Sequence, residues 1–428
     1  MKFRSVFYLV LFVLVSMDAL ASGSKQTQRD RNAVRSGPGN FYPLLYVLPR
    51  ETPVKVLEKK GGWVRVKVEG KKALATVEPK ARSTSGWLSE RCFAKKKARR
   101  DFRSLKMISN EKVSKAGVAA AVRGFATRYG KASSSEVSSF FRSHWNILTP
   151  EDYLAFQRES RRVLSTSNEN FGSDITGGYL QSYEPTMEEE GIGLGIAIRV
   201  LGNKMVRDEK KLRYINAIAL YLSQFTGAYD IPFRVFLVNQ PGYNAGSAPG
   251  GFIFVNQDLV GLCQNEAELA GVIAHEMSHI ILRHGLKETN ERGLKVKLES
   301  RFEELETEAG WDESEVGAEL SSMALRAYDM LVKPRLQSYE EEADMGAMIL
   351  LARAGYEPRS VPRVVKAMAQ ALQKRENSDA DMGHGDLDEP FRSLDFKKRT
   401  EALFAFAKKT MARIKGATQR ERFQRVFR

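Results

Sequence analysis

Cysteine, histidine and long apolar runs are all scarce in this 428-residue chain. Its two cysteines, Cys92 and Cys263, allow at most one disulfide, which excludes a disulfide-rich scaffold. Their spacing alone does not distinguish a bridge from two buried free thiols. Apart from the amino terminus, no stretch approaches the ~20 apolar residues that a membrane-spanning helix needs, and no internal repeat is present. The length of 428 residues suits two or three domains.

The first 21 residues have the three parts of a secretory signal peptide. Lys2 and Arg4 precede a continuous apolar core at residues 6–15, and an A-x-A cleavage pattern follows at residues 19–21. No cysteine follows that pattern, which argues against a lipoprotein. We therefore expect a soluble, exported protein that is periplasmic or secreted.

The chain is basic, with 67 Lys and Arg against 52 Asp and Glu and a net charge of +15. Much of the excess lies in residues 397–428, where basic residues accompany the apolar positions of an amphipathic helix. Such a helix can pack on its own domain with a solvated basic face, which we favour, or contact an anionic membrane surface. Nucleic acid is the generic partner of positive charge, but it is not expected for an exported protein.

Residues 30–93 have the pattern of a small all-β unit. Four short strands are expected, at residues 44–48, 54–58, 63–68 and 86–88. The segment NAVRSGPG at residues 32–39, with the later Gly62-Trp63 and Gly86-Trp87-Leu88, resembles a bacterial SH3-like domain. That resemblance implies a small barrel that binds cell-wall peptide or another protein. The alternative is that the tryptophans only pack the barrel, and we favour this for Trp63.

An H-E-x-x-H motif at residues 275–279 lies in a mostly apolar segment that has the character of a helix. On a helix His275 and His279 share one face and can direct two imidazole nitrogens at one zinc ion, while Glu276 can reach a water on that ion. A chance match is the alternative interpretation. However, three of the five histidines of the chain fall in this segment, and burying them among apolar residues is costly unless they are paired or bound to metal.

A third ligand is available in the segment that starts at residue 338. Glu340 can complete a two-His, one-Glu set that holds one zinc per chain and leaves a position for water. Asp344 lies one helical turn later and can accept the other ring N–H of a ligating histidine. The alternative is a solvated acidic face, but small residues at three nearby positions favour close packing against another helix.

These motifs resemble the zinc metallopeptidase family that includes HtpX-like, Oma-type and CAAX prenyl proteases, in its soluble periplasmic BepA-like branch. The resemblance rests on N-A-x-x-x-P-G-G at residues 244–251, H-E-x-x-H at 275–279, E-x-x-A-D at 340–344 and A-G-Y-x-P at 354–358. It covers residues 185–405. It implies an α+β fold, mainly a helical zincin domain of gluzincin type with a small β-sheet, preceded by the SH3-like barrel.

One departure concerns the Thr-His-Pro and following Arg that family members often carry near the end of the domain. Arg399 matches the arginine, but the His and Pro are missing, and His384 lies upstream. His384 and Arg399 are therefore candidates for an oxyanion or regulatory role. His284 and Tyr339 are further candidates for the oxyanion donor.

Domain boundaries follow from these patterns. The predicted layout after the signal peptide comprises the SH3-like domain at 30–93, a basic linker and helical region at 94–165, the peptidase domain at 166–417 and a basic tail at 418–428. Within the peptidase domain we expect strands at 233–238 and 252–255, and a core helix at 206–225.

The segment at residues 244–251 is expected to be a glycine-rich sheet edge that binds an extended substrate through main-chain hydrogen bonds. Its candidate residues are Asn244, Ala245, Pro249, Gly250 and Gly251. The predicted function is zinc-dependent endoproteolysis of misfolded or misassembled envelope proteins, with Glu276 as general base toward a zinc-activated water. The alternative is a weakly catalytic or non-catalytic chaperone or scaffold that the SH3-like domain targets to the cell wall or to a protein partner.

Overall fold

A computed structural model of the chain divides into two compact units, Met1–Lys97 and Ala98–Arg428. The residues it describes are 24–29, 32–70, 84–94, 147–163, 183, 185, 187–201, 204–285, 287, 336–378 and 395–428. The predicted signal peptide, most of the predicted linker and His384 lie outside them. No helix within the described ranges is long and apolar enough to cross a membrane.

The first unit is a six-stranded antiparallel sheet in the order β1-β4-β5-β6-β2-β3. Its strands are β1 (Ser24–Gln26), β2 (Asn32–Arg35), β3 (Leu44–Leu48), β4 (Pro53–Lys60), β5 (Trp63–Val68) and β6 (Ser85–Ser89). Alternate residues of β5, Val64, Val66 and Val68, enter the core, as the period-two pattern predicts. Trp63 and Trp87 are both buried, which fits the packing interpretation. The prediction of an all-β amino-terminal unit is confirmed.

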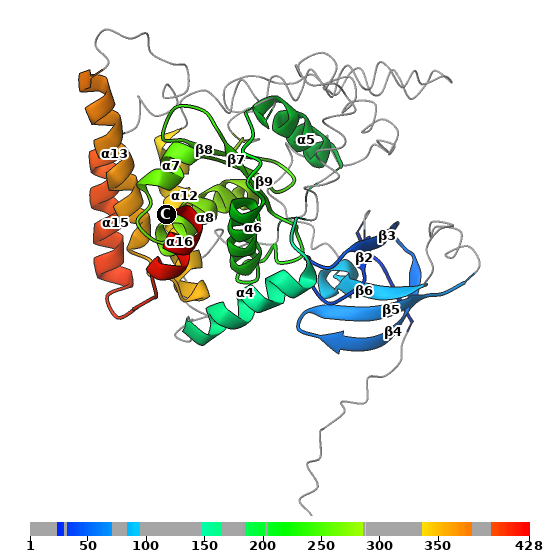
Figure 1. The fold of residues 1–428 in the computed structure, drawn as a ribbon. Helices are drawn as coiled ribbons and strands as arrows, with labels where there is room; N and C mark the ends of the chain where they lie inside the picture. Colours follow the sequence, from blue (N-terminus) through cyan, green and yellow to red (C-terminus); the bar gives the residue numbers. More distant parts are fainter. Residues whose placement is uncertain are drawn as a thin grey trace, which may run out of the picture. The chain divides into compact units, whose positions relative to one another are not determined.

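The second unit is mainly helical with one small sheet, which confirms the predicted α+β class (Figure 1). Up to the end of α8 its elements are α4 (Pro150–Val163), α5 (Met187–Leu201), α6 (Glu209–Ser223), β7 (Arg234–Val238), β8 (Ala245–Ala248), β9 (Phe252–Asn256), α7 (Gln257–Leu262) and α8 (Glu266–Leu282). They are followed by α12 (Gln337–Ala354), α13 (Ser360–Ser378), α15 (Phe396–Thr410) and α16 (Arg420–Phe427). Cys263 of this unit and Cys92 of the first are both buried free thiols.

The small sheet has the order β7-β9-β8, with β9 parallel to β7 and antiparallel to β8. Apolar residues of α5 pack on the face that carries Phe236 and Phe254, while α8 packs against β8. The outer edge of β7 is closed by Asn216 of α6, which donates to the carbonyl of Val235 and accepts its N–H. No described strand pairs with the outer edge of β8.

Helix α8 is held firmly at its amino terminus. Asn265 caps it by accepting from the backbone of Glu268, whose carboxylate accepts in return from Asn265 Nδ2 and from the backbone of Gln264. The next residue, Glu266, is fully buried and accepts hydrogen bonds from three more side chains, those of Tyr214, Tyr356 and Arg422. Its negative charge at this end of the helix is also favourable to the helix dipole.

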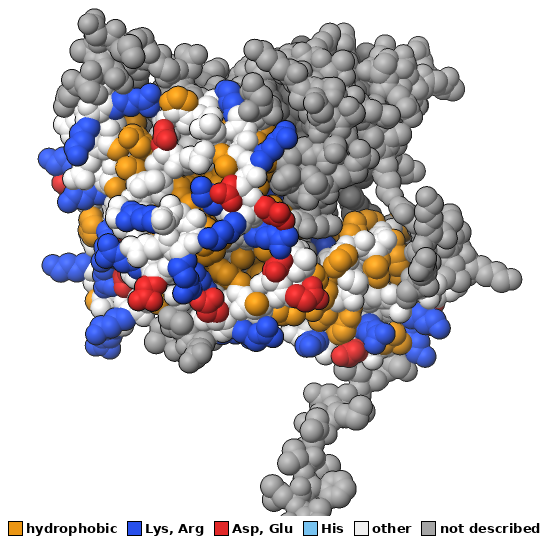
Figure 2. Space-filling view, viewed as in Figure 1, with side chains coloured by type: hydrophobic (Ala, Val, Ile, Leu, Met, Phe, Trp, Pro, Cys, Tyr) orange, Lys and Arg blue, Asp and Glu red, His pale blue; other side chains and the backbone are white. Residues whose placement is uncertain are grey.

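The carboxy-terminal residues belong to the helical unit. The predicted basic tail at 418–428 instead forms α16, which buries Arg422 and Phe423 and packs on α6 and α8. Helix α15 buries Arg399, Leu403 and Ala407 and exposes its lysines. In Figure 2, Lys and Arg side chains gather along the edge where Figure 1 shows α13 and α15. The chain end thus follows the packed-helix interpretation, and membrane contact stays a prediction.

Candidate metal centre

Helix α8 brings His275 and His279 to one point. Every residue of α8 except His275 is buried, so the site opens on the side of His275. The Nε2 atoms of the two rings lie 3.0 Å apart. The four-residue spacing places both rings on one helical face, as the sequence predicts.

Helix α12 supplies the third group. It packs closely on α8 through small buried residues, among them Ala343, Gly346 and Ala347. This contact places Glu340 Oε2 3.3 Å from His275 Nε2 and Glu340 Oε1 3.3 Å from His279 Nε2. A tetrahedral zinc with ligand bonds of ~2.0–2.1 Å has ligand atoms about 3.3 Å apart, so each of these separations has the length expected between two ligands of such a site.

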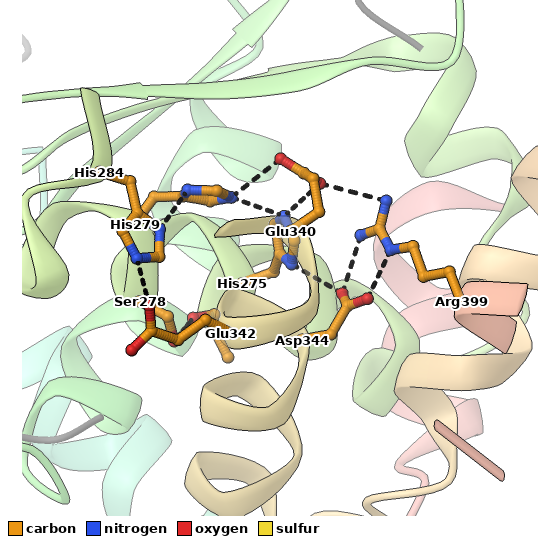
Figure 3. Close-up of polar contacts among 9 residues, drawn as sticks. His275, Ser278, His279, His284, Glu340, Glu342, Asp344 and Arg399 are labelled. Carbon is orange, nitrogen blue, oxygen red and sulfur yellow. Dashed lines mark hydrogen bonds and ion pairs between the residues drawn. The ribbon is translucent and has the colours of Figure 1, made fainter. Parts of the chain in front are cut away.

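The other ring nitrogens show which atoms carry protons. His275 Nδ1 lies 2.8 Å from Asp344 Oδ1, and His279 Nδ1 lies 2.9 Å from His284 Nδ1 (Figure 3). A carboxylate only accepts, so His275 Nδ1 must be the donor to Asp344. A neutral His275 therefore presents a lone pair at Nε2, which can accept a hydrogen bond or bind a metal ion. Two imidazole nitrogens and one carboxylate are a donor set that zinc binds well.

Arg399 of α15 adds a buried positive charge to the centre. Its guanidinium donates to Asp344 through Nε at 2.5 Å and Nη2 at 2.8 Å, and Nη1 lies 3.1 Å from Glu340. Burial would raise the pKa of Glu340, but the charge of Arg399 and the contacts with both histidines hold it well below its ordinary value. Burial likewise opposes ionisation of Asp344, and Arg399 together with His275 lowers the pKa of that carboxyl. Both acids are therefore ionised at neutral pH.

In the metal-free centre His275 is a strong base. Burial would lower the pKa of its ring, but the hydrogen bonds and charges of Asp344 and Glu340 raise it to about 9. A metal ion must therefore displace one proton from this ring at neutral pH.

Glu276 is the acidic residue next to His275 on α8. It is buried, and its charge contributes to raising the pKa of Arg399. Its carboxylate therefore lies within the range of an electrostatic interaction with Arg399.

Of the other residues singled out in the sequence, Arg399 and Asp344 lie in the centre. His284 and Tyr339 are placed differently from the expectation that they could donate to an oxyanion. His284 lies behind His279, its Nε2 is 3.1 Å from Glu342 Oε2, and its ring stacks on that of Tyr339. Glu342 was not singled out, although the clustering of histidines at 275, 279 and 284 was a signal that a further histidine belonged to the site.

The segment predicted to bind substrate has two different parts. Asn244 O accepts from Asn256 N in the ladder to β9, so the N–H and C=O groups of Ala245 and Ser247 point away from β9 to the free edge. Their side chains share a sheet face with Ile253 and Val255, opposite to the face covered by α5.

The backbone groups of Pro249, Gly250 and Gly251 are used within the fold. The Pro249 carbonyl packs against Gly193 of α5, Gly250 N donates to the Tyr183 hydroxyl, and Gly251 O accepts from Arg234 N. The two glycines have φ values of 83° and 97°, which side chains rarely adopt. The glycines serve a tight turn, and this corrects the expectation that the whole segment forms an open edge.

Comparison with known proteins agrees with this architecture. Residues 209–408 match the model of Peptidase family M48, and residues 32–92 match that of a Bacterial SH3 domain. The beta-barrel assembly-enhancing protease of Escherichia coli (strain K12) is 25% identical over 166 residues, which are 38% of this chain and 34% of that protein. The protein of the same name from Yersinia pestis is 27% identical over 172 residues, 39% of this chain and 34% of that protein.

A more distant similarity extends to eukaryotes. The mitochondrial metalloendopeptidase OMA1 of Arabidopsis thaliana is 31% identical over 140 residues, 33% of this chain and 26% of that protein. The matched part thus spans about a third of the length of these relatives or less.

Proposed function

We propose that this chain, which carries a peptidase domain of family M48 behind a bacterial SH3 domain, is a zinc-dependent metalloendopeptidase. The observation that carries the proposal is the convergence of His275, His279 and Glu340. The two Nε2 atoms lie 3.0 Å apart, and each lies 3.3 Å from one carboxylate oxygen of Glu340. These three residues would hold the zinc, and His275 is the one among them that is not fully buried.

Zinc, when bound, lowers the pKa of a water toward ~7 and polarises the scissile carbonyl. Glu276 accepts the proton of that water as it attacks and then transfers it to the leaving amine. Asp344 holds the ring of His275 in the tautomer with Nε2 free. Arg399 keeps both Glu340 and Asp344 ionised, so that they remain available as ligand and as hydrogen-bond acceptor. Arg399 and His384 remain candidates for contact with the developing oxyanion.

The free edge of β8 is the proposed substrate site. A peptide that adds as a strand there bonds to the main chain of Ala245 and Ser247, and these bonds do not depend on substrate sequence. We therefore propose unfolded or misassembled proteins as substrates. The predicted export of the chain and its similarity to a protease named for enhancing β-barrel assembly direct this proposal to envelope proteins. The SH3 domain would add a protein or cell-wall ligand.

Incubation with several unfolded proteins tests this function. We expect zinc-dependent cleavage at many unrelated sites within extended segments, abolished by a chelator and restored by zinc. Prevention of aggregation without any cleavage would instead support the chaperone or scaffold alternative. Cleavage at a single strict consensus would contradict a backbone-binding edge.

A further inference from the structure

His284 occupies an unusual position behind the proposed metal ligand His279. It is 2% exposed, and both its ring nitrogens have partners, His279 Nδ1 at 2.9 Å and Glu342 Oε2 at 3.1 Å. Figure 3 shows Glu342, His284 and His279 as one chain of contacts that leads to Glu340.

We propose that His284 and Glu342 form a hydrogen-bond relay that fixes the tautomer and ring orientation of His279. The inference rests on the proposed metal site. If Nε2 of His279 binds the metal, its Nδ1 carries the proton and donates to Nδ1 of His284. The proton of His284 then lies on Nε2, where Glu342 accepts it. Each step determines the next, so the carboxylate at the end of the relay sets the direction of both bonds.

The backbone is shaped to bring His284 to this place. Arg283 ends α8 in the left-handed conformation, with φ of 56°, and this turn directs the following residue back over the last helical turn. Such a conformation is unfavourable for a residue other than glycine, by ~1 kcal/mol or more. The side chain of Arg283 holds the turn through a 2.7 Å ion pair with Glu189 and by lying over the ring of Tyr183.

Helix α12 provides the other half of the relay. Tyr339 directly precedes Glu340 on this helix, and Glu342 follows it two residues later. The Tyr339 ring stacks on His284 with centroids 4.5 Å apart and planes inclined by 11°. One helix therefore supplies both a ligand and the two groups that orient the partner of a second ligand.

The two histidines of the motif are thus supported by different chemistry. His275 donates directly to Asp344, which is paired with Arg399. His279 donates to the neutral imidazole of His284, and the carboxylate of Glu342 lies beyond that ring. The side chain of Glu342 is 32% exposed. Direct loss of such a partner typically costs ~10–100-fold in metal affinity.

Two substitutions of His284 separate orientation from packing. In His284→Asn the side-chain oxygen can occupy the place of Nδ1 and still accept from His279, but the contact with Glu342 is lost. In His284→Gln the amide reaches the place of Nε2 near Glu342 and leaves His279 Nδ1 without its acceptor. Glutamine is closer to histidine in volume, so a pure packing role predicts the opposite order.

The measurement is zinc affinity by competition with a chelator, together with the visible spectrum of the cobalt-substituted protein as a report on ligand geometry. We expect near wild-type affinity and spectrum for His284→Asn, and affinity lower by ~10–100-fold for His284→Gln. Equal or tighter binding by His284→Gln than by His284→Asn overturns the relay. Absence of zinc binding by the wild-type protein overturns the metal site itself, which is a different result.

A second pair of substitutions does not disturb the buried ring. Glu342→Gln keeps an acceptor for His284, whereas Glu342→Leu removes it, so the relay predicts weaker zinc binding only for Glu342→Leu. In the His284→Asn protein the Glu342→Leu change should have no further effect, because the contact is already cut. Additive losses in this double variant would contradict a relay and indicate independent structural roles.

Discussion

Replacement of Asp344 by Ala removes the carboxylate through which α12 contacts both His275 of α8 and Arg399 of α15. Asp344 is buried and accepts from His275 Nδ1, Arg399 Nε and Arg399 Nη2, with distances of 2.8, 2.5 and 2.8 Å. After the substitution the buried guanidinium of Arg399 still has Glu340 as an ion-pair partner, with Nη1 3.1 Å from Glu340 Oε2. It also frees the ring of His275 to rotate.

The free energy of unfolding and the zinc affinity should both fall, for different reasons. A fully uncompensated buried charge typically costs ~3–5 kcal/mol of unfolding free energy, against the ~5–15 kcal/mol of an ordinary domain. The loss in Asp344→Ala should be smaller than this, because Glu340 still pairs with Arg399. Zinc affinity should fall by ~10–100-fold because His275 loses its orienting acceptor. Asp344 also raises the pKa of His275, so zinc competes with a proton in the wild-type protein. The loss of zinc affinity should therefore be greater at pH 8.5 than at pH 7.

The assay is urea unfolding of zinc-free protein, followed separately by zinc competition on the folded protein. Arg399→Met and the double variant Asp344→Ala/Arg399→Met are the controls. Removal of both partners should cost less than the sum of the single changes, by on the order of 1–3 kcal/mol. Additive losses, or an Asp344→Ala protein with unchanged stability and zinc affinity, would refute the reasoning.

Three further predictions concern protons, the domain boundary and helix α5. The pKa of His275, about 9 in the zinc-free protein and above its ordinary 6.5, means that its contribution to zinc-free stability is complete below pH 6.5 and lost as pH rises through 9. Between pH 6.5 and 8.5 zinc binding should accordingly release about one proton, and zinc affinity should rise ~tenfold per pH unit. Calorimetry in buffers of different ionisation enthalpy measures the proton release. A zinc affinity that does not change with pH would contradict this prediction. Protein that lacks residues 1–97 should cleave an unfolded protein at the full-length rate, and a folded but inactive product would show that the first unit helps to build the site. Gly193→Ala places a Cβ 1.8 Å from the Pro249 carbonyl oxygen, so α5 must shift; a loss of ~1–3 kcal/mol in thermal unfolding is expected, and unchanged stability would contradict the packing of α5 on this turn.

The sequence predicted those parts of the site that depend on local periodicity. Residues four apart on a helix share a face whatever the tertiary structure, so the convergence of His275 with His279 and the alignment of Glu340 with Asp344 could be read directly. The small residues Ala343, Gly346 and Ala347 predicted close packing against another helix, and α12 does pack closely on α8.

Features that depend on tertiary contacts could not be read in this way. The relay through His284 requires the left-handed turn at Arg283, which Glu189 holds from a segment about 90 residues earlier. The glycines after β8 have the composition of an open edge, and only the position of α5 shows that they form a covered turn. The burial of Arg422 against Glu266 likewise joins the chain end to α8 over 156 residues, where composition predicts only a basic tail.

We propose that His275, His279 and Glu340 hold one catalytic zinc beside the general base Glu276. The test is to titrate zinc into metal-free wild-type and Glu276→Gln proteins while cleavage of an unfolded protein is followed. Activity of the wild-type protein should rise to a plateau at one zinc per chain. Glu276→Gln should bind the same amount of zinc but cleave at least ~100-fold more slowly, because an amide cannot accept the proton of the water. Wild-type activity without zinc, or near wild-type activity of Glu276→Gln, would contradict the account.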